Sequence, residues 1–373
     1  MKVLHLNSYY IDNHLYSQLF NILETDTEQR VFIPIKFDRK PENVIPFKQT
    51  ELIFEQVIQP VHKYDYFGKI IKITNRAIQK KVNEGVDFVH AHNLFTDGAV
   101  AYELKKKFGL KYIVAVRTTD IGLQYKYMYH RRFKIQKVLL AAEHIIFISP
   151  TYRDKLLSMM SENFIKKIEN KIKIIPNGIN TVWLEEKKEP TGKPLKDKVN
   201  LLYVGQIMAR KNLDTVINAI DVLNQKGNKD YHLTIIGGAN TYEQTYFDNF
   251  LLSIQDKKEI TYLGKINDKY ALLEEYRKSD IFVMPSKAEL FGLVYIEALS
   301  QGKPILYSKG EGINGYLEDK HAGIAVNPNN TDEIADGIEN IAKNYETYTS
   351  FTEIIAPFNW ASITTTYKQM YAE

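Results

Sequence analysis

Two carboxylates, Glu289 and Glu297, stand eight residues apart in the segment PSKAELFGLVYIEALSQGKP at residues 285–304. Apolar residues repeat at helical spacing after the first of them, so we expect a helix to begin between the two. The amides of residues 291–293 then form the open first turn, where free N–H groups and a partial charge of about +0.5 favour an anion such as a diphosphate. The pattern favours a sugar nucleotide, with Glu297 facing the ribose diol and Glu289 facing the sugar.

The elements around these carboxylates form a strand–helix–strand unit. Residues 281–284 are apolar, Pro285-Ser286 stops the strand, and Gly302-Lys303-Pro304 ends the helix before a strand at 305–307. A purely structural interpretation, with Glu289 solvated and the loop capping the helix, explains the same residues.

A second segment supplies cations. In LYVGQIMARKNLD, residues 202–214, a strand ends at Gly205 and a helix begins near Asn212. Lys211 at this turn can reach a departing diphosphate as a point charge, and Arg210 can add a bidentate fork. The alternative is that Arg210 and Lys211 are ordinary basic residues on the surface.

The carboxylate segment closely resembles the signature of the retaining nucleotide-sugar glycosyltransferases of family four, which have the GT-B fold: two glutamates separated by seven residues, with Phe-Gly-Leu between them. The resemblance implies that Lys211 contacts the donor phosphates and that Glu289 binds sugar hydroxyls. It implies that the other donor-binding residues are Gly205, Gln206, Gly238, Leu263, Phe291, Gly292, Leu293 and Glu297. Most relatives carry an arginine where this chain has Gln206, and Arg210 is the candidate replacement for that charge.

The acceptor side is expected in the first half of the chain. The loop Asn7-Ser8-Tyr9-Tyr10 lacks the paired glycines of many relatives, and Asn7 and Ser8 are expected to hydrogen-bond instead. His90 and His92 share one face of a strand, and we expect His92 to project towards the cleft. A satisfied core histidine is the equal alternative for either residue.

A second acceptor-side loop contains VRTTD, with Arg117 where numerous relatives carry a histidine near the reacting sugar. A permanent cation cannot act as a base, but it can hold an anionic acceptor or a phosphate. Arg117 and Asp120 are therefore predicted to be acceptor-side residues.

Short β-rich runs alternate with helical stretches along the whole chain, which predicts an α/β protein with parallel sheets. We expect two Rossmann-like domains, at residues 1–185 and 198–356, facing across a cleft that holds the site at the carboxyl ends of the strands. The resemblance implies that a C-terminal helix, residues 360–373, crosses back onto the first domain. The twelve predicted strands are 3–6, 31–35, 88–92, 112–117, 144–148, 173–176, 201–204, 233–236, 261–263, 281–284, 305–307 and 324–326.

Composition limits the chemistry. The 373 residues include no cysteine, so the chain has neither a disulfide framework nor a thiolate metal site. It contains no Asp-x-Asp pair and no His-x-x-x-His arrangement, which favours metal-independent catalysis with no cofactor beyond the nucleoside-diphosphate sugar. The opening MKVLHLNSYY is typical of a strand, not of a signal peptide, and no apolar run reaches the ~18–20 residues that cross a bilayer. We expect a cytoplasmic protein.

Charge is divided unevenly between the halves. Residues 1–180 hold 28 Lys and Arg against 18 Asp and Glu, whereas residues 181–373 hold 21 against 27. A basic first half favours anionic lipid headgroups or a lipid diphosphate at the inner face of the membrane. Nucleic acid is not expected, because no nucleic-acid-binding signature accompanies the charge.

Two basic stretches could contact a membrane or an acceptor. Residues 67–82 combine an apolar stripe (Phe67, Ile70, Ile71, Thr74, Ile78 and Val82) with a cationic one (Lys69, Lys72, Arg76 and Lys80), as in helices that lie on membranes. Residues 125–137 interleave four aromatic rings with five Lys and Arg side chains, a pattern suited to a lipid-linked or charged glycan. Ordinary amphipathic helices explain both stretches as well.

The resemblance implies retaining transfer of a sugar from a nucleoside-diphosphate sugar to a glycan or lipid-linked acceptor. Attack would come from the leaving-group face, with the diphosphate as base. The first half, including AVRTTD, resembles capsular and exopolysaccharide glycosyltransferases. Two alternatives stay open: an epimerase or phosphorylase on the same scaffold, and a non-catalytic nucleotide-sugar or glycan-binding subunit.

Overall fold

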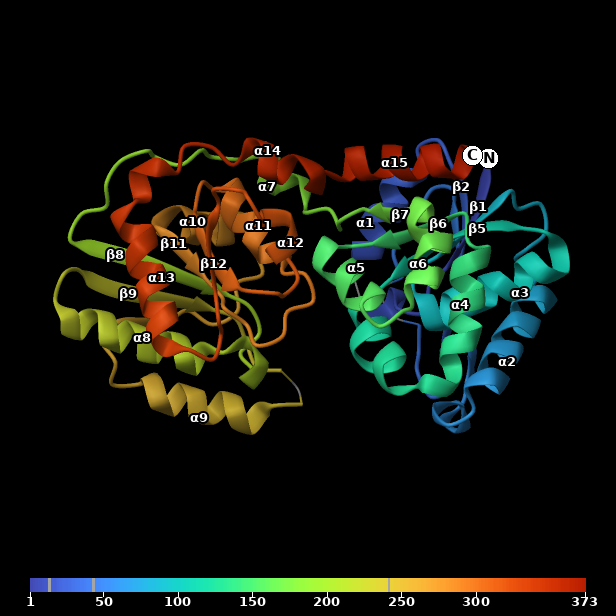
Figure 1. Ribbon diagram of the computed structural model, residues 1–373, viewed down its shortest axis with the longest axis horizontal. Coiled ribbons are helices and arrows are strands. Elements are labelled where there is room, and N and C mark those ends of the chain that lie inside the picture. The colour runs from blue at the N-terminus through green and yellow to red at the C-terminus, as the bar shows by residue number, and fades with distance from the viewer. Residues whose placement is uncertain (13–14, 42–43, 241) are drawn as a thin grey trace. The chain divides into compact units, whose positions relative to one another are not determined.

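The chain folds into two α/β units in a computed structural model that describes residues 1–12, 15–41, 44–240 and 242–373 (Figure 1). Unit 1 comprises Met1–Asn177 and Trp360–Glu373, and unit 2 comprises Gly178–Asn359. Each unit holds one parallel sheet, of seven strands in unit 1 and six in unit 2. The predicted pair of parallel-sheet α/β domains is confirmed.

The sheet of unit 1 has the strand order β3-β2-β1-β4-β5-β6-β7. Its strands are β1 Lys2–Leu6, β2 Glu28–Lys36, β3 Thr50–Ile58, β4 Phe88–Ala91, β5 Lys111–Val116, β6 His144–Phe147 and β7 Ile172–Ile174. The sequence prediction missed β3. This strand lies at the edge of the sheet and most of its side chains are only partly buried, so its apolar residues do not alternate clearly.

The helices of unit 1 include the last helix of the chain. The α-helices are α1 Leu15–Leu23, α2 Tyr66–Gln79, α3 Ala99–Phe108, α4 Arg132–Ala141, α5 Pro150–Leu157, α6 Glu162–Ile168 and α15 Trp360–Ala372. Shorter helical turns are η1 Tyr10–Asp12, η2 Pro60–Lys63, η3 Leu94–Gly98, η4 Asp120–Tyr125, η5 Tyr129–Arg131 and η6 Glu169–Lys171. α2 packs against α3, and α3 packs against α4.

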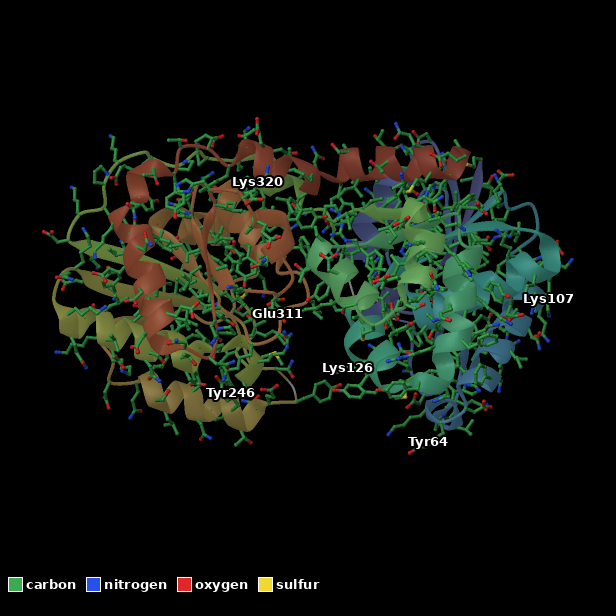
Figure 2. The ribbon with its side chains drawn as sticks, in the orientation of Figure 1. Tyr64, Lys107, Lys126, Tyr246, Glu311 and Lys320 are labelled. Carbon is green, nitrogen blue, oxygen red and sulfur yellow. The ribbon has the colours of Figure 1, made fainter. Side chains whose placement is uncertain are left out.

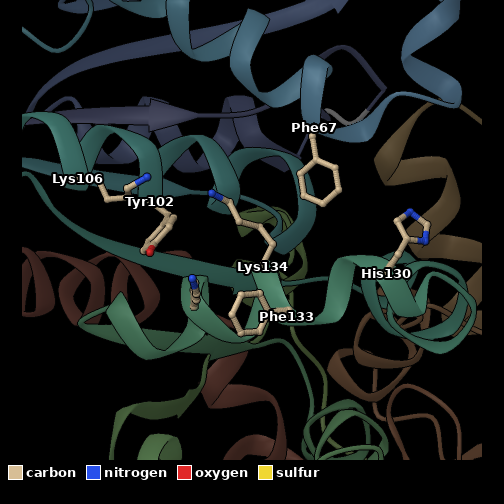
Figure 3. A pocket seen from close by; sticks show the side chains of 7 residues that line it. Phe67, Tyr102, Lys106, His130, Phe133 and Lys134 are labelled. Atoms are coloured by element: carbon tan, nitrogen blue, oxygen red, sulfur yellow. The ribbon is translucent and has the colours of Figure 1, made fainter.

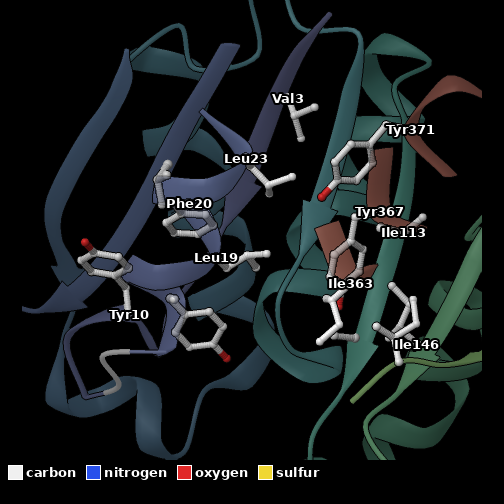
Figure 4. Close-up of a cluster of buried hydrophobic side chains, with 14 of the residues drawn as sticks. Val3, Tyr10, Leu19, Phe20, Leu23, Ile113, Ile146, Ile363, Tyr367 and Tyr371 are labelled. Carbon is white, nitrogen blue, oxygen red and sulfur yellow. The ribbon is translucent and has the colours of Figure 1, made fainter. Parts of the chain in front are cut away.

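A core of aromatic and branched side chains joins α1 and α15 to the sheet of unit 1 (Figure 4). Phe20 from α1 and Tyr367 from α15 are buried in the same cluster as Ile113 and Ile146 from the central strands. The Trp360 indole N–H also donates to Gln18 Oε1 at 3.0 Å. The C-terminal helix is therefore part of the hydrophobic core of unit 1.

The apolar stripe predicted along α2 is mostly a core face. Ile70 and Thr74 are buried, and Val82 just beyond the helix is buried too. On the cationic stripe, Arg76 and Lys80 form ion pairs with Glu55 on β3. Of the stripe's apolar residues only Phe67 and Ile71 are exposed, so the structural interpretation accounts for most of this helix.

The sheet of unit 2 has the strand order β10-β9-β8-β11-β12-β13. Its strands are β8 Lys198–Val204, β9 Asp230–Ile236, β10 Ile260–Tyr262, β11 Ile281–Val283, β12 Ile305–Ser308 and β13 Gly323–Val326. Its α-helices are α7 Thr181–Glu185, α8 Leu213–Lys226, α9 Gln244–Ile254, α10 Lys269–Lys278, α11 Leu293–Ser300, α12 Asn314–Leu317, α13 Thr331–Lys343 and α14 Thr352–Ile355. Short turns are η7 Ala209–Lys211, η8 Tyr345–Thr347 and η9 Ala356–Phe358.

Unit 2 begins at Gly178, earlier in the chain than the domain boundary predicted between residues 185 and 198. α7 packs against α11, and Trp183 is buried with its ring 5.1 Å from the ring of Tyr276. A buried tryptophan makes this segment part of the unit 2 core. Within the described ranges, no helix is long and apolar enough to cross a membrane.

Candidate functional site

The two motif segments of unit 2 meet at the point where its strand order reverses. β8 and β11 are neighbours, and the chain runs outward from β8 to one edge of the sheet and from β11 to the other. Ligands of open parallel sheets bind beyond the carboxyl ends of the strands at such a switch point. The loops that follow β8 and β11 contain residues 205–212 and 284–292, so both predicted donor segments emerge there.

An ion pair joins these two loops. Lys211 Nζ contacts Glu289 Oε2, and each residue is only 8% exposed. Ser286 Oγ also donates to Glu289 Oε2, at 3.4 Å, and Met284 Sδ lies 3.7 Å from Lys211 Nζ. Desolvating two charges is expensive and is a weak way to stabilise a fold. The pair is therefore better understood as a charge centre held for a ligand, because functional sites retain such groups.

The turn that presents Lys211 depends on Asn212, which sequence analysis treated only as a helix start. Asn212 has a φ of 64°, a left-handed conformation that asparagine tolerates better than most residues. Its side-chain amide donates to Pro285 O at 3.0 Å and to Pro328 O at 2.6 Å. This side chain thus fixes the β8 loop, and Lys211 with it, against the β11 loop.

Arg210 lies beside the same loop as Lys211. Its Nη1 donates to Ala288 O at 2.8 Å, and its backbone carbonyl accepts from Lys287 N at 2.8 Å. Gln206 is exposed, and its Oε1 accepts from Asn240 Nδ2 at 3.2 Å. The structure therefore places the Arg210 guanidinium against the β11 loop, which also contains Glu289, although the chain carries glutamine directly after Gly205.

The start of α11 is built around Gly292. This residue caps the helix with a φ of 78°, and a Cβ atom there would lie 2.4 Å from the Tyr295 ring. Glycine is therefore required both by conformation and by space. Leu293 begins the helix, whereas the Phe291 ring is buried against Tyr316 and Phe358. Phe291 can offer only its backbone to a ligand.

Glu297 lies one turn along α11 from that start and is partly buried. Burial raises the pKa of Glu297 to about 7, while the nearby Tyr276 hydroxyl and then Lys269 act in the opposite direction. The Tyr276 hydroxyl donates to Glu297 Oε2 at 3.3 Å. Because a diol that donates hydrogen bonds favours the ionised carboxylate, a ribose would lower this pKa.

The remaining predicted donor residues line the loops after β8, β9 and β10. Gly237 packs so closely on the β8 loop that a Cβ atom there would be 1.8 Å from Gly205 O. Gly238 O accepts from Ile207 N at 2.9 Å, and Gly237 N donates to Gly264 O at 2.9 Å. Leu263, next to Gly264, is exposed. These contacts tie the three loops together at the carboxyl edge.

Unit 1 has its own switch point, between β1 and β4. The loop after β1 meets the loop after β4 through Asp97, whose carboxylate oxygens each lie 3.1 Å from Ser8 N. Asn93 Nδ2 donates to Ser8 Oγ at 2.7 Å and to Asp97 Oδ2 at 2.5 Å. Buried Asn7 accepts from Tyr9 N at 3.1 Å. Asn93 and Asp97 were missed by sequence analysis, because nothing in their local spacing marks them.

The two buried carboxylates of this cluster organise loops. Asp120 is completely buried and accepts from the backbone amides of Leu94, Phe95 and Arg117 at 3.0, 3.3 and 2.8 Å. Burial raises the pKa of Asp120 to about 6 and that of Asp97 to about 8, and hydrogen bonds oppose both shifts. In this structure Asp120 acts on neighbouring loops through their backbone amides.

Positively charged side chains lie beside the loops that hold Asp97 and Asp120. Arg117 Nε donates to His92 O at 2.8 Å, and its guanidinium lies 5.7 Å from the centre of the Tyr16 ring. Lys69 Nζ donates to Thr96 Oγ1 at 3.0 Å, and burial, followed by the nearby charge of Arg131, lowers the pKa of Lys69. Lys69 and Arg131 were not predicted here. Together with Arg117 they provide positive charge suited to an anionic group.

The expectation that His92 projects towards a cleft is wrong. His5, His90 and His92 are all completely buried, and the rings of His90 and His92 stack at 4.0 Å. His5 Nδ1 and His92 Nε2 are 3.1 Å apart, and His90 Nδ1 is 2.7 Å from the Tyr371 hydroxyl. Burial lowers the pKa of His5 to about 3 and those of His90 and His92 well below the usual range. They are neutral core histidines.

Two family models match the chain. The model described as "Glycosyltransferase Family 4" matches residues 28–183, and the model described as "Glycosyl transferases group 1" matches residues 185–356. The first match lies in unit 1 and runs a few residues beyond it, and the second lies in unit 2. The two matches together cover nearly the whole length of the chain.

Individual relatives agree with these models. An uncharacterized glycosyltransferase of Methanocaldococcus jannaschii is 25% identical over 297 residues, which cover 78% of this chain and 76% of that protein. Sucrose-phosphate synthase from Thermosynechococcus elongatus is similar in structure with a TM-score of 0.74 and 19% identity, covering 100% of this chain and 98% of the other. HepE from Anabaena in complex with UDP-glucose gives a TM-score of 0.69 and 16% identity, covering 100% and 99%. These similarities confirm the predicted fold.

Proposed function

The chain belongs to the family 4 glycosyltransferases and has the GT-B fold, and we propose that it is a retaining enzyme. It would move a sugar from a nucleoside-diphosphate sugar to a glycan or lipid-linked acceptor. HepE, which shares the fold, has been solved with UDP-glucose bound, and this supports a sugar nucleotide as the donor.

The observation that carries the proposal is the charge centre of unit 2. Lys211 and Glu289 form their ion pair where the β8 and β11 loops meet. Glu289 lies three residues before Gly292, the N-cap of α11. A lysine, a neighbouring Arg210 and an open helix start are the groups that stabilise a diphosphate. Glu297 on the same helix would accept hydrogen bonds from the ribose.

In the proposed reaction the bond between the sugar C1 and the diphosphate oxygen breaks, and C1 becomes oxocarbenium-like. Lys211, Arg210 and the amides at the start of α11 stabilise the charge that develops on the diphosphate. The acceptor hydroxyl attacks C1 from the face that the diphosphate leaves, and its proton passes to a diphosphate oxygen. Attack on this face retains the configuration at C1. Glu289 holds the sugar hydroxyls and exchanges part of its contact with Lys211 for them.

The acceptor is proposed to bind at the switch point of unit 1. Arg117 contributes a permanent positive charge there, while Asn7 and Asp120 hold the surrounding loops. A phosphorylated or carboxylated acceptor would suit these cations. We place the reaction in the cytoplasm, at the inner face of the membrane, in the synthesis of capsular or exported polysaccharide.

The proposed reaction uses no resident metal and no cofactor. Among the described residues, His5, His90 and His92 form the one cluster with the spacing of metal ligands. The cluster is buried in the core of unit 1 and contributes no carboxylate, so a divalent cation would bring an unbalanced charge into an apolar region. Activity should therefore survive dialysis against a chelator.

The test uses purified full-length protein and a panel of UDP-, GDP- and ADP-sugars. The true donor should raise the midpoint of thermal unfolding. Slow release of nucleoside diphosphate in the absence of an acceptor should show that the protein cleaves the bond between the sugar and the diphosphate. Once an acceptor is found, the anomeric coupling in the product's NMR spectrum reports retention or inversion. An inverted product would refute the retaining mechanism.

A non-catalytic binding subunit is the second candidate function, because the exposed Gln206 replaces a cation directly after Gly205. Binding of a sugar nucleotide without turnover, even with candidate acceptors present, would favour that subunit. Interconversion of the donor's sugar without transfer would instead indicate an epimerase.

A further inference from the structure

A pocket of about 260 Å³ opens on unit 1 between side chains of α2, α3, η5 and α4 (Figure 3). It lies where Phe67 of α2 faces α3 and the start of α4. Aromatic rings and basic groups alone line it: Phe67, Tyr102, Lys106, His130, Phe133, Lys134 and Lys137. Small-molecule pockets usually measure about 300–1,000 Å³, so this one suits a headgroup-sized ligand better than a whole sugar nucleotide.

Large apolar side chains are exposed on the elements that line this pocket and just before them. Phe133 is 69% exposed, Phe67 48% and Ile71 59%. Tyr129, just before α4, is 67% exposed, and Tyr64, just before α2, is 82% exposed (Figure 2). Single exposed apolar residues are ordinary, but a group of them around one pocket indicates an interaction surface.

The same elements are strongly basic. Residues 123–140 contain five Lys and Arg side chains and no Asp or Glu, and residues 63–81 contain six with a single acid, Asp65. Lys137 Nζ lies 4.3 Å from the centre of the Phe133 ring, and the Arg132 guanidinium lies 4.2 Å from that of Tyr129. Cations and rings are therefore presented together, not on separate faces.

One carboxylate moderates this charge. Glu103 on α3 forms ion pairs with Lys134 and Lys106. Two of the lining lysines are thereby engaged, whereas exposed Lys137 and His130 project from α4 and η5. The surface keeps a net positive charge after Glu103 is counted.

We propose that this surface, formed by Phe67, Ile71, Tyr129, His130, Phe133 and Lys137, docks unit 1 on an anionic lipid bilayer. Aromatic rings favour the depth of the headgroups, where one part of the ring is apolar and another meets water. Lysines that reach the lipid phosphates gain electrostatic attraction from the anionic leaflet. The pocket between the rings receives a lipid phosphate.

Charge argues for a bilayer over a second copy of the chain. A two-fold contact would place this basic surface against itself, and like charges would repel. A lipid surface supplies both the negative charge and the apolar layer that the exposed Phe and Ile side chains require. Membrane docking requires neither a donor nor turnover, so it can be tested independently of the proposed transfer reaction.

The test is cosedimentation of the full-length protein with vesicles of phosphatidylcholine alone and of phosphatidylcholine mixed with one-third phosphatidylglycerol. We expect binding to the anionic vesicles only. Binding should weaken with added salt, because the screening length falls from about 10 Å at 0.1 M to about 3 Å at 1 M.

The variant that tests the surface combines Phe133→Ser with Lys137→Glu. Both residues are exposed on α4 and neither belongs to the loop cluster of unit 1, so circular dichroism and nucleoside-diphosphate release should match the wild type. Reversal of one charge should reduce anionic-vesicle binding by at least about fivefold, since each lysine near such a surface contributes roughly that factor. The matched control combines Tyr270→Ser with Lys320→Glu on unit 2, where both residues are exposed.

The proposal would be overturned by equal binding to neutral and anionic vesicles, by wild-type binding of the folded Phe133→Ser/Lys137→Glu variant, or by an equal loss in the unit 2 control. Loss of vesicle binding with intact donor turnover would support the surface whatever the fate of the transfer reaction. Self-association through these residues, seen by sedimentation velocity without lipid, would also contradict it.

Discussion

The two switch points of this molecule use carboxylates in opposite ways. In unit 2, Glu289 is paired with Lys211, and the pKa of Glu297 is about 7. Both carboxylates can therefore change their interactions when a ligand brings charge or hydroxyl groups. In unit 1, Asp97 and Asp120 are buried and bind backbone amides of neighbouring loops. The carboxylates near the two switch points thus differ: those of unit 2 pair with side chains, whereas those of unit 1 accept hydrogen bonds from loop amides.

We expect the two units to divide the chemistry in the same way, with charge stabilisation in unit 2 and acceptor binding in unit 1. We expect a diphosphate that reaches Lys211 to compete with Glu289 and to release that carboxylate for the sugar. At the switch point of unit 1, where we propose that the acceptor binds, Arg117 is held by its hydrogen bond to His92 O. The following predictions are ordered by their expected effect on turnover.

Lys211→Ala should give the largest loss. Removing one preorganised charge from a transition-state site typically lowers kcat by about 10²–10³-fold, while donor affinity should change less because the charge matters most as the bond breaks. Steady-state kinetics and calorimetry with the donor measure the two effects. Lys287→Ala, an exposed lysine of the adjacent loop, is the matched control.

Because Lys211→Ala leaves Glu289 without its lysine, stability must be checked separately. Adding Glu289→Gln should restore the thermal midpoint without restoring kcat. Unchanged kcat in the folded single variant would remove the proposed mechanism.

Glu297→Gln should weaken nucleoside-diphosphate binding by about 10- to 100-fold, the usual range for a hydrogen bond to a charged group. With a pKa of about 7, Glu297 is protonated at lower pH, so wild-type affinity should fall as pH drops below 7. The variant should show a flatter dependence in calorimetry between pH 5.5 and 8.5 (roughly the window around this pKa). Glu318→Gln, at an exposed position, should keep the wild-type profile.

Gly292→Ala should disturb the donor site through packing. Gly227 has a similar φ of 68° with no neighbour for a Cβ atom, whereas a Cβ atom added at Gly292 would meet the Tyr295 ring. Gly227→Ala should cost about 1 kcal/mol from backbone conformation alone. Gly292→Ala should lose about 1–3 kcal/mol more and bind donor more weakly. Equal melting temperatures for the two variants would contradict the close contact.

Asp97→Asn should have the smallest effect on turnover and should change stability in a pH-dependent way. Its pKa rises from 3.8 to about 8 on folding. The contribution of protonated Asp97 to the free energy of unfolding is therefore fully present below pH 3.8 and is lost progressively as the pH rises to about 8. Relative to wild type, the variant should therefore gain stability as pH rises across this window, and urea-unfolding midpoints can follow it. A constant difference between the two proteins, or the same trend in the exposed control Asp38→Asn, would contradict this account.

The comparison also shows what the sequence could predict. All twelve predicted strands are present, because buried parallel strands are short apolar runs bounded by turn residues. The residues predicted to bind the donor on the β8 and β11 loops could be picked out because each of these two loops is one continuous segment. Their ion pair was not predicted, since Lys211 and Glu289 are separated by 78 positions in the chain and meet only through the order of the strands.

The unit 1 cluster was harder to predict, for a physical reason. Asp97 acts by accepting hydrogen bonds from a loop 89 positions away, and no spacing rule connects it to Ser8. His92 was expected near the site, yet α1 and α15 cover its face of the sheet, a packing that depends on a helix from the far end of the chain. Residues that act through tertiary hydrogen bonds leave little signal in one sequence.

The most direct test of the central claim is a crystal structure with the best donor's nucleoside diphosphate bound. We predict the diphosphate within hydrogen-bond distance of Lys211 Nζ and the amides that begin α11, with the ribose on Glu297 and with Glu289 partly released from the lysine. A nucleotide bound elsewhere, with the Lys211–Glu289 pair intact, would contradict the account.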